Sequence, residues 1–148
     1  MCKSLSKKQT SKGEVAHSSK IISVLIVEDE LIIAMDLRNI LESLGCRICA
    51  STANGEESIH LASECRPDLV LMDIRLKGKI DGIQAASTIQ SRANIPIIYL
   101  SAYGDEETMK QALKVAVSHF IRKPFSETEI INKIESVLGG IKKYPYTN

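Results

Sequence analysis

Short, mostly apolar runs alternate along this chain with longer segments in which apolar residues recur every three or four positions. The short runs are typical of buried strands and comprise ISVLIV (22–27), RICAS (47–51), DLVLM (68–72), IPIIYL (95–100) and VSHFI (117–121). The longer segments are typical of helices with one apolar face and span 30–45, 55–65, 82–92, 105–115 and 126–138. A strand followed by a helix therefore occurs five times in succession.

Residues that break or cap regular structure separate these segments. Gly45 is placed to end the first helix, and Pro67 breaks the chain before the third strand. Ser126 with Glu129 matches a capping box at the start of the last helix, and Gly139-Gly140 should end it. These units predict an α/β fold: a single domain with a doubly wound parallel sheet covered by helices on both faces.

Polar residues stand where the strands of this sheet should end. The first and third strands, VLIV and LVLM, are apolar throughout and should be central. In such sheets ligands bind beyond the carboxyl ends of the strands. At these ends the chain places Glu28-Asp29, Asp73, Ser101 and Lys123, after the first, third, fourth and fifth strands. We therefore expect these side chains to converge on one edge of the sheet.

This set of side chains fits a site for a divalent cation and a phosphoryl group. Carboxylates are ligands that Mg²⁺ prefers, and an aspartate such as Asp73 can also accept a phosphoryl group covalently. The Ser101 hydroxyl could hydrogen-bond a phosphoryl oxygen, and the Lys123 ammonium could neutralise one or pair with Asp73. Each residue alone has a simpler interpretation as a cap, a solvated acid or a turn residue. Their joint occurrence at strand ends favours phosphoryl chemistry.

Composition and charge indicate a soluble globular protein of 148 residues, 44% hydrophobic and 25% charged, with a net charge of +1. No apolar run reaches the ~20 residues of a membrane helix, and no secretion signal is recognisable, so we expect a cytoplasmic protein without a membrane partner. Residues 1–20 contain five Lys and one Glu and should form a disordered, solvated tail. Residues 21–139 should form the folded domain, and residues 140–148 should form a short tail. The mildly acidic remainder fits a cation site better than DNA binding.

The cysteines are Cys2, Cys46, Cys49 and Cys65, and the second and third form a CxxC pair. Such a pair can be a redox centre or half of a zinc site. Here it falls in a predicted strand, where a spacing of three directs the two side chains to opposite faces. We therefore interpret these cysteines as small apolar residues in a reducing compartment.

From Ile22 to Leu138 the chain resembles a response-regulator receiver domain of two-component signalling (CheY-like). The residues that carry the resemblance are Glu28-Asp29, Asp73, Asp81-Gly82, Ser101 and Lys123-Pro124-Phe125. The resemblance implies a flavodoxin-like sheet with strand order 2-1-3-4-5. It also implies Mg²⁺, or Mn²⁺, held by Asp29, Asp73 and the backbone carbonyl of Arg75, with Glu28 in the outer shell.

The resemblance further implies that a sensor histidine kinase, or a small donor such as acetyl phosphate, phosphorylates Asp73. The Ser101 hydroxyl would then move towards the phosphoryl group, Phe120 would turn inward, and the face of helix 4, strand 5 and helix 5 would change its downstream protein partner. The domain would assist its own phosphorylation and dephosphorylation without turning over an external substrate. It would be a monomer or a phosphorylation-dependent dimer, and the bond before Pro124 is expected to be cis.

Several residues depart from the family pattern. The loop IRLKGKID (74–81) is longer than in many members, and Arg75 within it is bulky and positively charged. Arg75 and Tyr103, together with Ala102, are possible modulators of phosphate lifetime because they could shield the phosphoryl group. Phe120 lacks a hydroxyl and can signal by packing only. Ala116 stands where a helix-ending glycine is usual.

Other functions remain open from the sequence. A metal-dependent phosphatase or mutase could use Asp73 as its nucleophile, but Arg75 occupies the position where many such enzymes have a second aspartate. A phosphorylation-independent interaction module would leave the site residues without a role. The favoured interpretation is a single-domain response regulator. A phosphorelay receiver that passes phosphate to a histidine phosphotransfer protein, or a module of a longer kinase, is the alternative.

Overall fold

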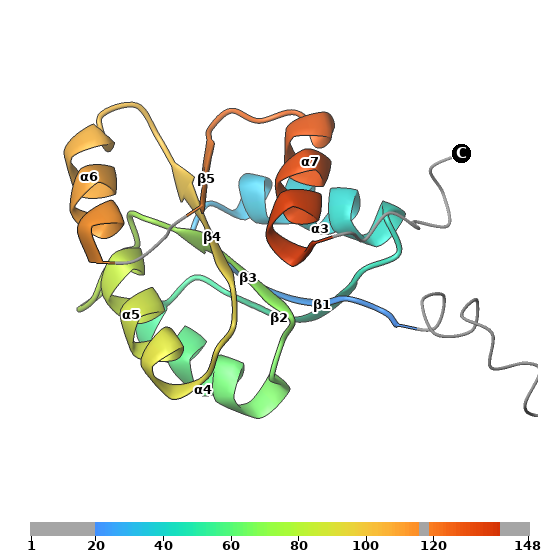
Figure 1. The fold of residues 1–148 in the computed structure, drawn as a ribbon, viewed down its shortest axis with the longest axis horizontal. Helices are drawn as coiled ribbons and strands as arrows, with labels where there is room; N and C mark the ends of the chain where they lie inside the picture. Colours follow the sequence, from blue (N-terminus) through green and yellow to red (C-terminus); the bar gives the residue numbers. More distant parts are fainter. Residues whose placement is uncertain (1–19, 116–118, 140–148) are drawn as a thin grey trace, which may run out of the picture.

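The computed structural model describes residues 20–115 and 119–139, which form a five-stranded parallel sheet flanked by helices (Figure 1). The strands are β1 (Ser23–Val27), β2 (Arg47–Thr52), β3 (Leu69–Asp73), β4 (Ile97–Ser101) and β5 (His119–Arg122). The helices are α3 (Leu31–Ser43), α4 (Gly55–Cys65), α5 (Gly82–Arg92), α6 (Glu106–Val115) and α7 (Glu127–Leu138). The strand order β2-β1-β3-β4-β5 confirms the predicted flavodoxin-like topology.

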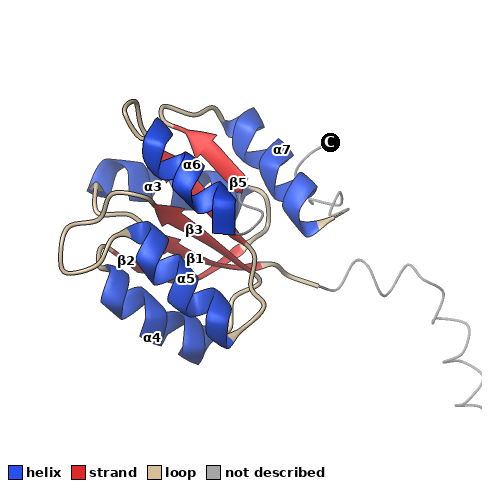
Figure 2. Ribbon diagram, turned by 60° about the vertical axis from the view of Figure 1, so that its left-hand side comes forward, coloured by secondary structure: helices blue, strands red, loops and turns tan. Residues whose placement is uncertain are grey.

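The hydrophobic core lies on both faces of the sheet. Every residue of β1, β3 and β4 is buried, because successive side chains of a strand point to opposite faces and helices cover both. Val24 and Ile26 pack on the face covered by α3 and α7, and Leu25 and Val27 pack on the face covered by α4 and α5. Figure 2 shows α4 and α5 side by side on their face. The prediction that the first and third strands are internal is confirmed.

Side chains cap the helices that follow β2, β3 and β5. The Asn54 side chain accepts a hydrogen bond from the first turn of α4. Capping boxes open α5, with Asp81 and Gln84, and α7, with Ser126 and Glu129. The box at Ser126 was predicted from the sequence and is confirmed, as is the cis bond before Pro124.

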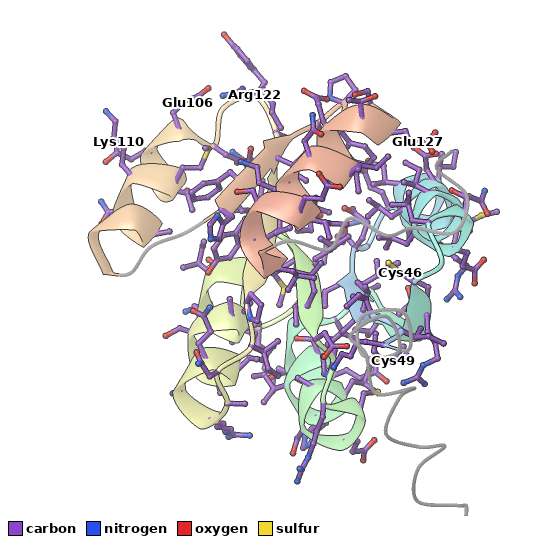
Figure 3. All side chains as sticks on the ribbon, turned by 45° about the vertical axis from the view of Figure 1, so that its right-hand side comes forward. Cys46, Cys49, Glu106, Lys110, Arg122 and Glu127 are labelled. Atoms are coloured by element: carbon purple, nitrogen blue, oxygen red, sulfur yellow. The ribbon has the colours of Figure 1, made fainter. Side chains whose placement is uncertain are left out.

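The two cysteines of the CxxC pair pack on opposite faces of the sheet, as the sequence predicted. Cys46 belongs to the cluster beneath α3 and α7, and Cys49 packs against the cluster beneath α4 and α5 (Figure 3). Burial, more than the charge of Asp68, raises the pKa of the Cys46 thiol to about 11. A thiol with such a pKa forms little of the reactive thiolate, in keeping with a packing role.

Some predictions concern residues outside the described ranges, and one differs from what the structure shows. Residues 1–19 of the tail that was expected to be disordered (1–20), Ala116, and the tail at 140–148 lie outside the described ranges. Within those ranges, no helix is long and apolar enough to cross a membrane. Leu31 and Met35 on α3 are 71% and 54% exposed, because the side of the helix that packs on the core carries Ile33, Ala34, Leu37, Ile40 and Leu41 instead.

A close contact between α5 and β3 positions the end of the central strand. The Gly82 amide donates a hydrogen bond of 2.9 Å to the Ile74 carbonyl. A Cβ atom at position 82 would lie 1.9 Å from the Asp73 carbonyl oxygen. Glycine is required here because any side chain would push the start of α5 away from the backbone of Asp73.

Gly82→Ala should therefore lower the free energy of unfolding by roughly 3 kcal/mol, because backbone must move to admit the methyl group. Gly139→Ala is the matched control: Gly139 has a φ of 65° but open space around its Cβ position. Only the conformational cost of about 1 kcal/mol is expected there. Urea unfolding of both variants measures the difference, and equal losses would contradict the close contact.

Candidate functional site

The carboxyl ends of β1, β3 and β5 bring together the acidic and basic residues that were predicted to converge. Glu28 and Asp29 follow β1, Asp73 ends β3, and Lys123 follows β5. Asp29, Asp73 and Lys123 line a cleft of about 250 Å³. Its wall is completed by residues of the β3–α5 and β4–α6 loops, among them Arg75.

The Lys123 ammonium lies among the carboxylates of this cleft. Its Nζ is 3.0 Å from Glu28 Oε1, 3.3 Å from Asp73 Oδ1 and 3.7 Å from Glu30 Oε1. Glu28 and Asp73 are 3% and 5% exposed. Removing Lys123 would leave both buried acids without a compensating charge, which is strongly destabilising. One ammonium therefore ties the end of β5 to the ends of β1 and β3.

Burial and neighbouring charge alter the protonation of the cluster. Burial, followed by the negative charge of Glu28 and a hydrogen bond with it, raises the pKa of Asp73 to about 7, against the opposing effect of Lys123. Burial alone would lower the pKa of Lys123, but hydrogen bonds and charges from Glu28 and Asp73 outweigh it, so this pKa is raised. Lys123 therefore stays charged, while Asp73 is partly protonated near neutral pH unless a further positive charge is present.

The residues fit a divalent cation. Glu28, Asp29 and Asp73 each offer a carboxylate oxygen, and these atoms lie within 4.8 Å of one another. Even without the more exposed Glu30, these three carboxylates and the Lys123 ammonium leave two negative charges uncompensated when all are ionised. Glu28 Oε1 is buried, and Lys123, 3.0 Å away, is its charged partner. A hard cation with oxygen ligands could hold these atoms together and supply the missing positive charge.

The two predicted switch residues lie on the neighbouring strands β4 and β5. Ser101 is fully buried, and its hydroxyl donates to the Ile121 carbonyl at 3.5 Å, the outer limit for a hydrogen bond, rather than to Asp73. Phe120 is half-buried and stacks on Tyr99, with ring centroids 5.4 Å apart. Both side chains are thus in contacts that a local rearrangement could exchange for others.

Arg75 makes contacts that the sequence did not predict. Its backbone N–H donates to Asp73 Oδ1 at 3.2 Å, while its guanidinium reaches the β4–α6 loop and donates to Asp105 and to the Gly104 carbonyl. Asp105 was visible in the sequence only as an acid at a helix start, which indicates a cap or a dipole partner. Tyr103, the other predicted modulator, is 91% exposed. The ligand role of the Arg75 carbonyl stays a prediction.

Comparison with known proteins identifies a matching family and its relatives. The family model described as "Response regulator receiver domain" matches residues 24–135. Transcriptional regulatory protein PdtaR of Mycobacterium tuberculosis is 38% identical over 112 residues, which cover 76% of this chain and 54% of PdtaR. Chemotaxis protein CheY of Halobacterium salinarum is 38% identical over 116 residues, which cover 78% of this chain and 95% of that protein. The chain thus spans about half the length of PdtaR but matches nearly all of CheY.

Solved structures show the same fold. The signal receiver domain of a modulated diguanylate cyclase from Desulfovibrio desulfuricans G20 superposes with a TM-score of 0.74 and 36% identity, covering 80% of this chain and 94% of that one. A chain of the CheX-CheY-BeF3-Mg+2 complex from Borrelia burgdorferi also has a TM-score of 0.74, with 30% identity, covering 81% of this chain and 92% of the other.

The raised pKa of Asp73 gives stability a defined pH dependence in the absence of divalent cations. An aspartate in an unfolded chain has a pKa of about 3.9, whereas Asp73 titrates at about 7. The native state therefore binds the extra proton between these values, so its stabilising effect is complete below about pH 4 and is lost as the pH rises through about 7.

Asp73→Asn should consequently raise the free energy of unfolding at pH 8 by more than about 1 kcal/mol in EDTA, with little effect at pH 4. Thermal or urea unfolding at the two pH values measures this difference. Asp36→Asn, which changes an exposed acid on α3, is the control and should have no such pH dependence. An effect of Asp73→Asn that is the same at both pH values would show that burial does not perturb this carboxyl group.

Proposed function

The chain belongs to the response regulator receiver family, and we propose that it accepts a phosphoryl group on Asp73 from a histidine kinase or from a small donor such as acetyl phosphate. Members of this family are signalling domains. The observation that carries the proposal is the placement of the Asp73 carboxylate at the end of the central strand, 3.3 Å from Lys123 and within a group of three carboxylates. A nucleophile, a cation ligand set and a fixed positive charge therefore share one cleft.

The transfer requires Asp73 in its ionised form. A carboxylate oxygen would bond to the donor phosphorus while the bond from phosphorus to the kinase histidine nitrogen, or to the acetate oxygen, breaks and its electron pair leaves with the donor. Lys123 favours the ionised carboxylate and would neutralise charge on the phosphoryl oxygens. The backbone N–H of Arg75, 3.2 Å from Asp73 Oδ1, orients the nucleophile.

We propose Mg²⁺, or Mn²⁺, as the cofactor, held by Asp29, Asp73 and the Arg75 backbone carbonyl, with Glu28 acting through water. Two observations support a cation: the uncompensated negative charge of the cluster and the carboxylate oxygens of Glu28, Asp29 and Asp73, which lie within 4.8 Å of one another. When bound, the cation supplies positive charge that keeps the carboxylates ionised and offsets the charge of the incoming phosphoryl group.

The signal would pass from Asp73 to a protein partner through Ser101 and Phe120. The hydroxyl of Ser101 makes only a long hydrogen bond, so a phosphoryl oxygen can compete for it. Phe120, with no hydroxyl of its own, would change its packing against Tyr99. The proposed output face is formed by α6, β5 and α7, where Figure 3 shows the charged residues Glu106, Lys110, Arg122 and Glu127.

Incubation with acetyl phosphate and Mg²⁺ should add the mass of one phosphoryl group to the protein, as measured by intact-protein mass spectrometry. Asp73→Asn should not be labelled because it lacks the nucleophile. Asp36→Asn removes an exposed carboxylate on α3 and should be labelled like the wild type. EDTA should suppress labelling, because the carboxylate cluster would then lack its cation.

The outcomes separate the competing functions. An unchanged wild-type mass, under conditions that label another receiver domain, would rule out the phosphoacceptor and favour a phosphorylation-independent interaction module. Sustained release of phosphate from a phosphate ester would favour a phosphatase. Full labelling in EDTA would contradict the cation while leaving Asp73 as the acceptor.

A further inference from the structure

The carboxylate of Asp105 is buried at the rim of the cleft and binds two groups. Asp105 is 1% exposed and precedes the first residue of α6. Its Oδ2 accepts a hydrogen bond of 2.6 Å from the Ala102 amide, and its Oδ1 accepts from Arg75 Nε. One carboxylate therefore closes the loop of residues 102–105, which we call the switch loop because it directly follows Ser101.

Arg75 connects this loop to the strand that carries the proposed phosphoacceptor. Arg75 lies two residues after Asp73, and its guanidinium spans from the β3–α5 loop to the switch loop. Its Nη2 also donates to the Gly104 carbonyl at 3.3 Å. The side chain is 66% exposed, so its outer edge faces solvent while Nε contacts a buried carboxylate. The guanidinium fork suits this double contact with the loop, which a lysine could not reproduce.

The Arg75–Asp105 pair and Asp73 share the cleft, so a charge added to one acts on the other. Asp73, Arg75, Ala102 and Asp105 all line it. Asp73 carries at most one negative charge, whereas a phosphoryl group carries about −1.5 to −2 charges and three acceptor oxygens. These oxygens are stronger competitors for guanidinium and amide donors than the unmodified carboxylate.

Resting on the proposed function, we propose that Arg75 is a positioning residue that holds the switch loop in its unphosphorylated position through Asp105. A phosphoryl group on Asp73 competes for the Arg75 guanidinium and for the Ala102 amide. Both are donors to Asp105 in the unphosphorylated protein, so their loss weakens the loop closure from both sides. Arg75 thereby couples charge at the acceptor to the position of the loop next to Ser101, and it opposes the switched state until that charge arrives.

The test compares backbone amide chemical shifts of residues 102–105 in the full chain. The free and beryllofluoride-bound wild type, with MgCl₂, define the two ends of a scale, since beryllofluoride imitates a phosphoryl group. Free Arg75→Gln and free Asp105→Asn should both lie between these ends, with an approximately fivefold larger switched population than the free wild type. Arg75→Lys keeps the charge but not the fork and should fall between Arg75→Gln and the wild type.

Lys77→Gln is the matched control. Lys77 lies in the same loop and lines the same cleft, so its replacement removes the same charge without touching Asp105. It should change the chemical shifts of the loop amides by less than about a third of the change in Arg75→Gln, because a single exposed charge has only a small effect. The double variant Arg75→Gln/Asp105→Asn should add little to either single change, because both remove one contact.

The possible outcomes test the role of Arg75 separately from the proposed function of Asp73. Loop amides of Arg75→Gln that coincide with those of the free wild type, or that move no further than in Lys77→Gln, would overturn the role of Arg75. Additive shifts in the double variant would overturn the coupling through Asp105. If beryllofluoride with MgCl₂ moved no amide of residues 73–75 in the wild type, the phosphoacceptor itself would be contradicted. Unchanged amide shifts in β2 verify that each variant is folded.

Discussion

A single ammonium group makes the buried acidic site possible. Glu28 and Asp73 are almost completely buried, and this burial, followed by the negative charge of Glu28, raises the pKa of Asp73. Without Lys123, 3.0 and 3.3 Å away, the two carboxylates would repel each other in a poorly solvated place. Because Lys123 follows the edge strand β5 and the acids follow β1 and β3, this ion pair also fixes the edge of the sheet on which the proposed chemistry depends.

Much of this arrangement could be predicted from the sequence, because parallel topology constrains it strongly. Continuous apolar runs identified the buried strands, and helical spacing between them required crossovers that place every strand end on one edge. Convergence of Glu28, Asp29, Asp73 and Lys123 then follows without knowledge of any side-chain conformation. The requirement for glycine at position 82 did not follow, because it arises from a contact between α5 and the Asp73 carbonyl that only the folded backbone defines.

Contacts between loops were also beyond the sequence. Nothing in the pattern showed that Arg75 would reach Asp105, 30 positions along the chain, or that the Ser101 hydroxyl would donate to Ile121. Such contacts depend on the relative position of two loops, which is set by strand register and not by periodicity. They are also the contacts through which the protein can respond. The ion pairs of Lys123 fix the position of Asp73. The Arg75–Asp105 pair at the rim of the cleft links the β3–α5 loop to the switch loop after Ser101.

The site therefore combines the buried ion pairs of Lys123 at its base with contacts of Arg75 and Ser101 that a phosphoryl group can replace. Every role proposed for the site depends on Asp73 as the group that receives the phosphoryl charge. Borohydride reduction of the protein labelled with acetyl phosphate, followed by peptide sequencing in a mass spectrometer, tests this most directly, since it converts an aspartyl phosphate to homoserine. Homoserine is expected at position 73 alone; homoserine in place of Asp29 or of another acid, with Asp73 unchanged, would contradict this assignment.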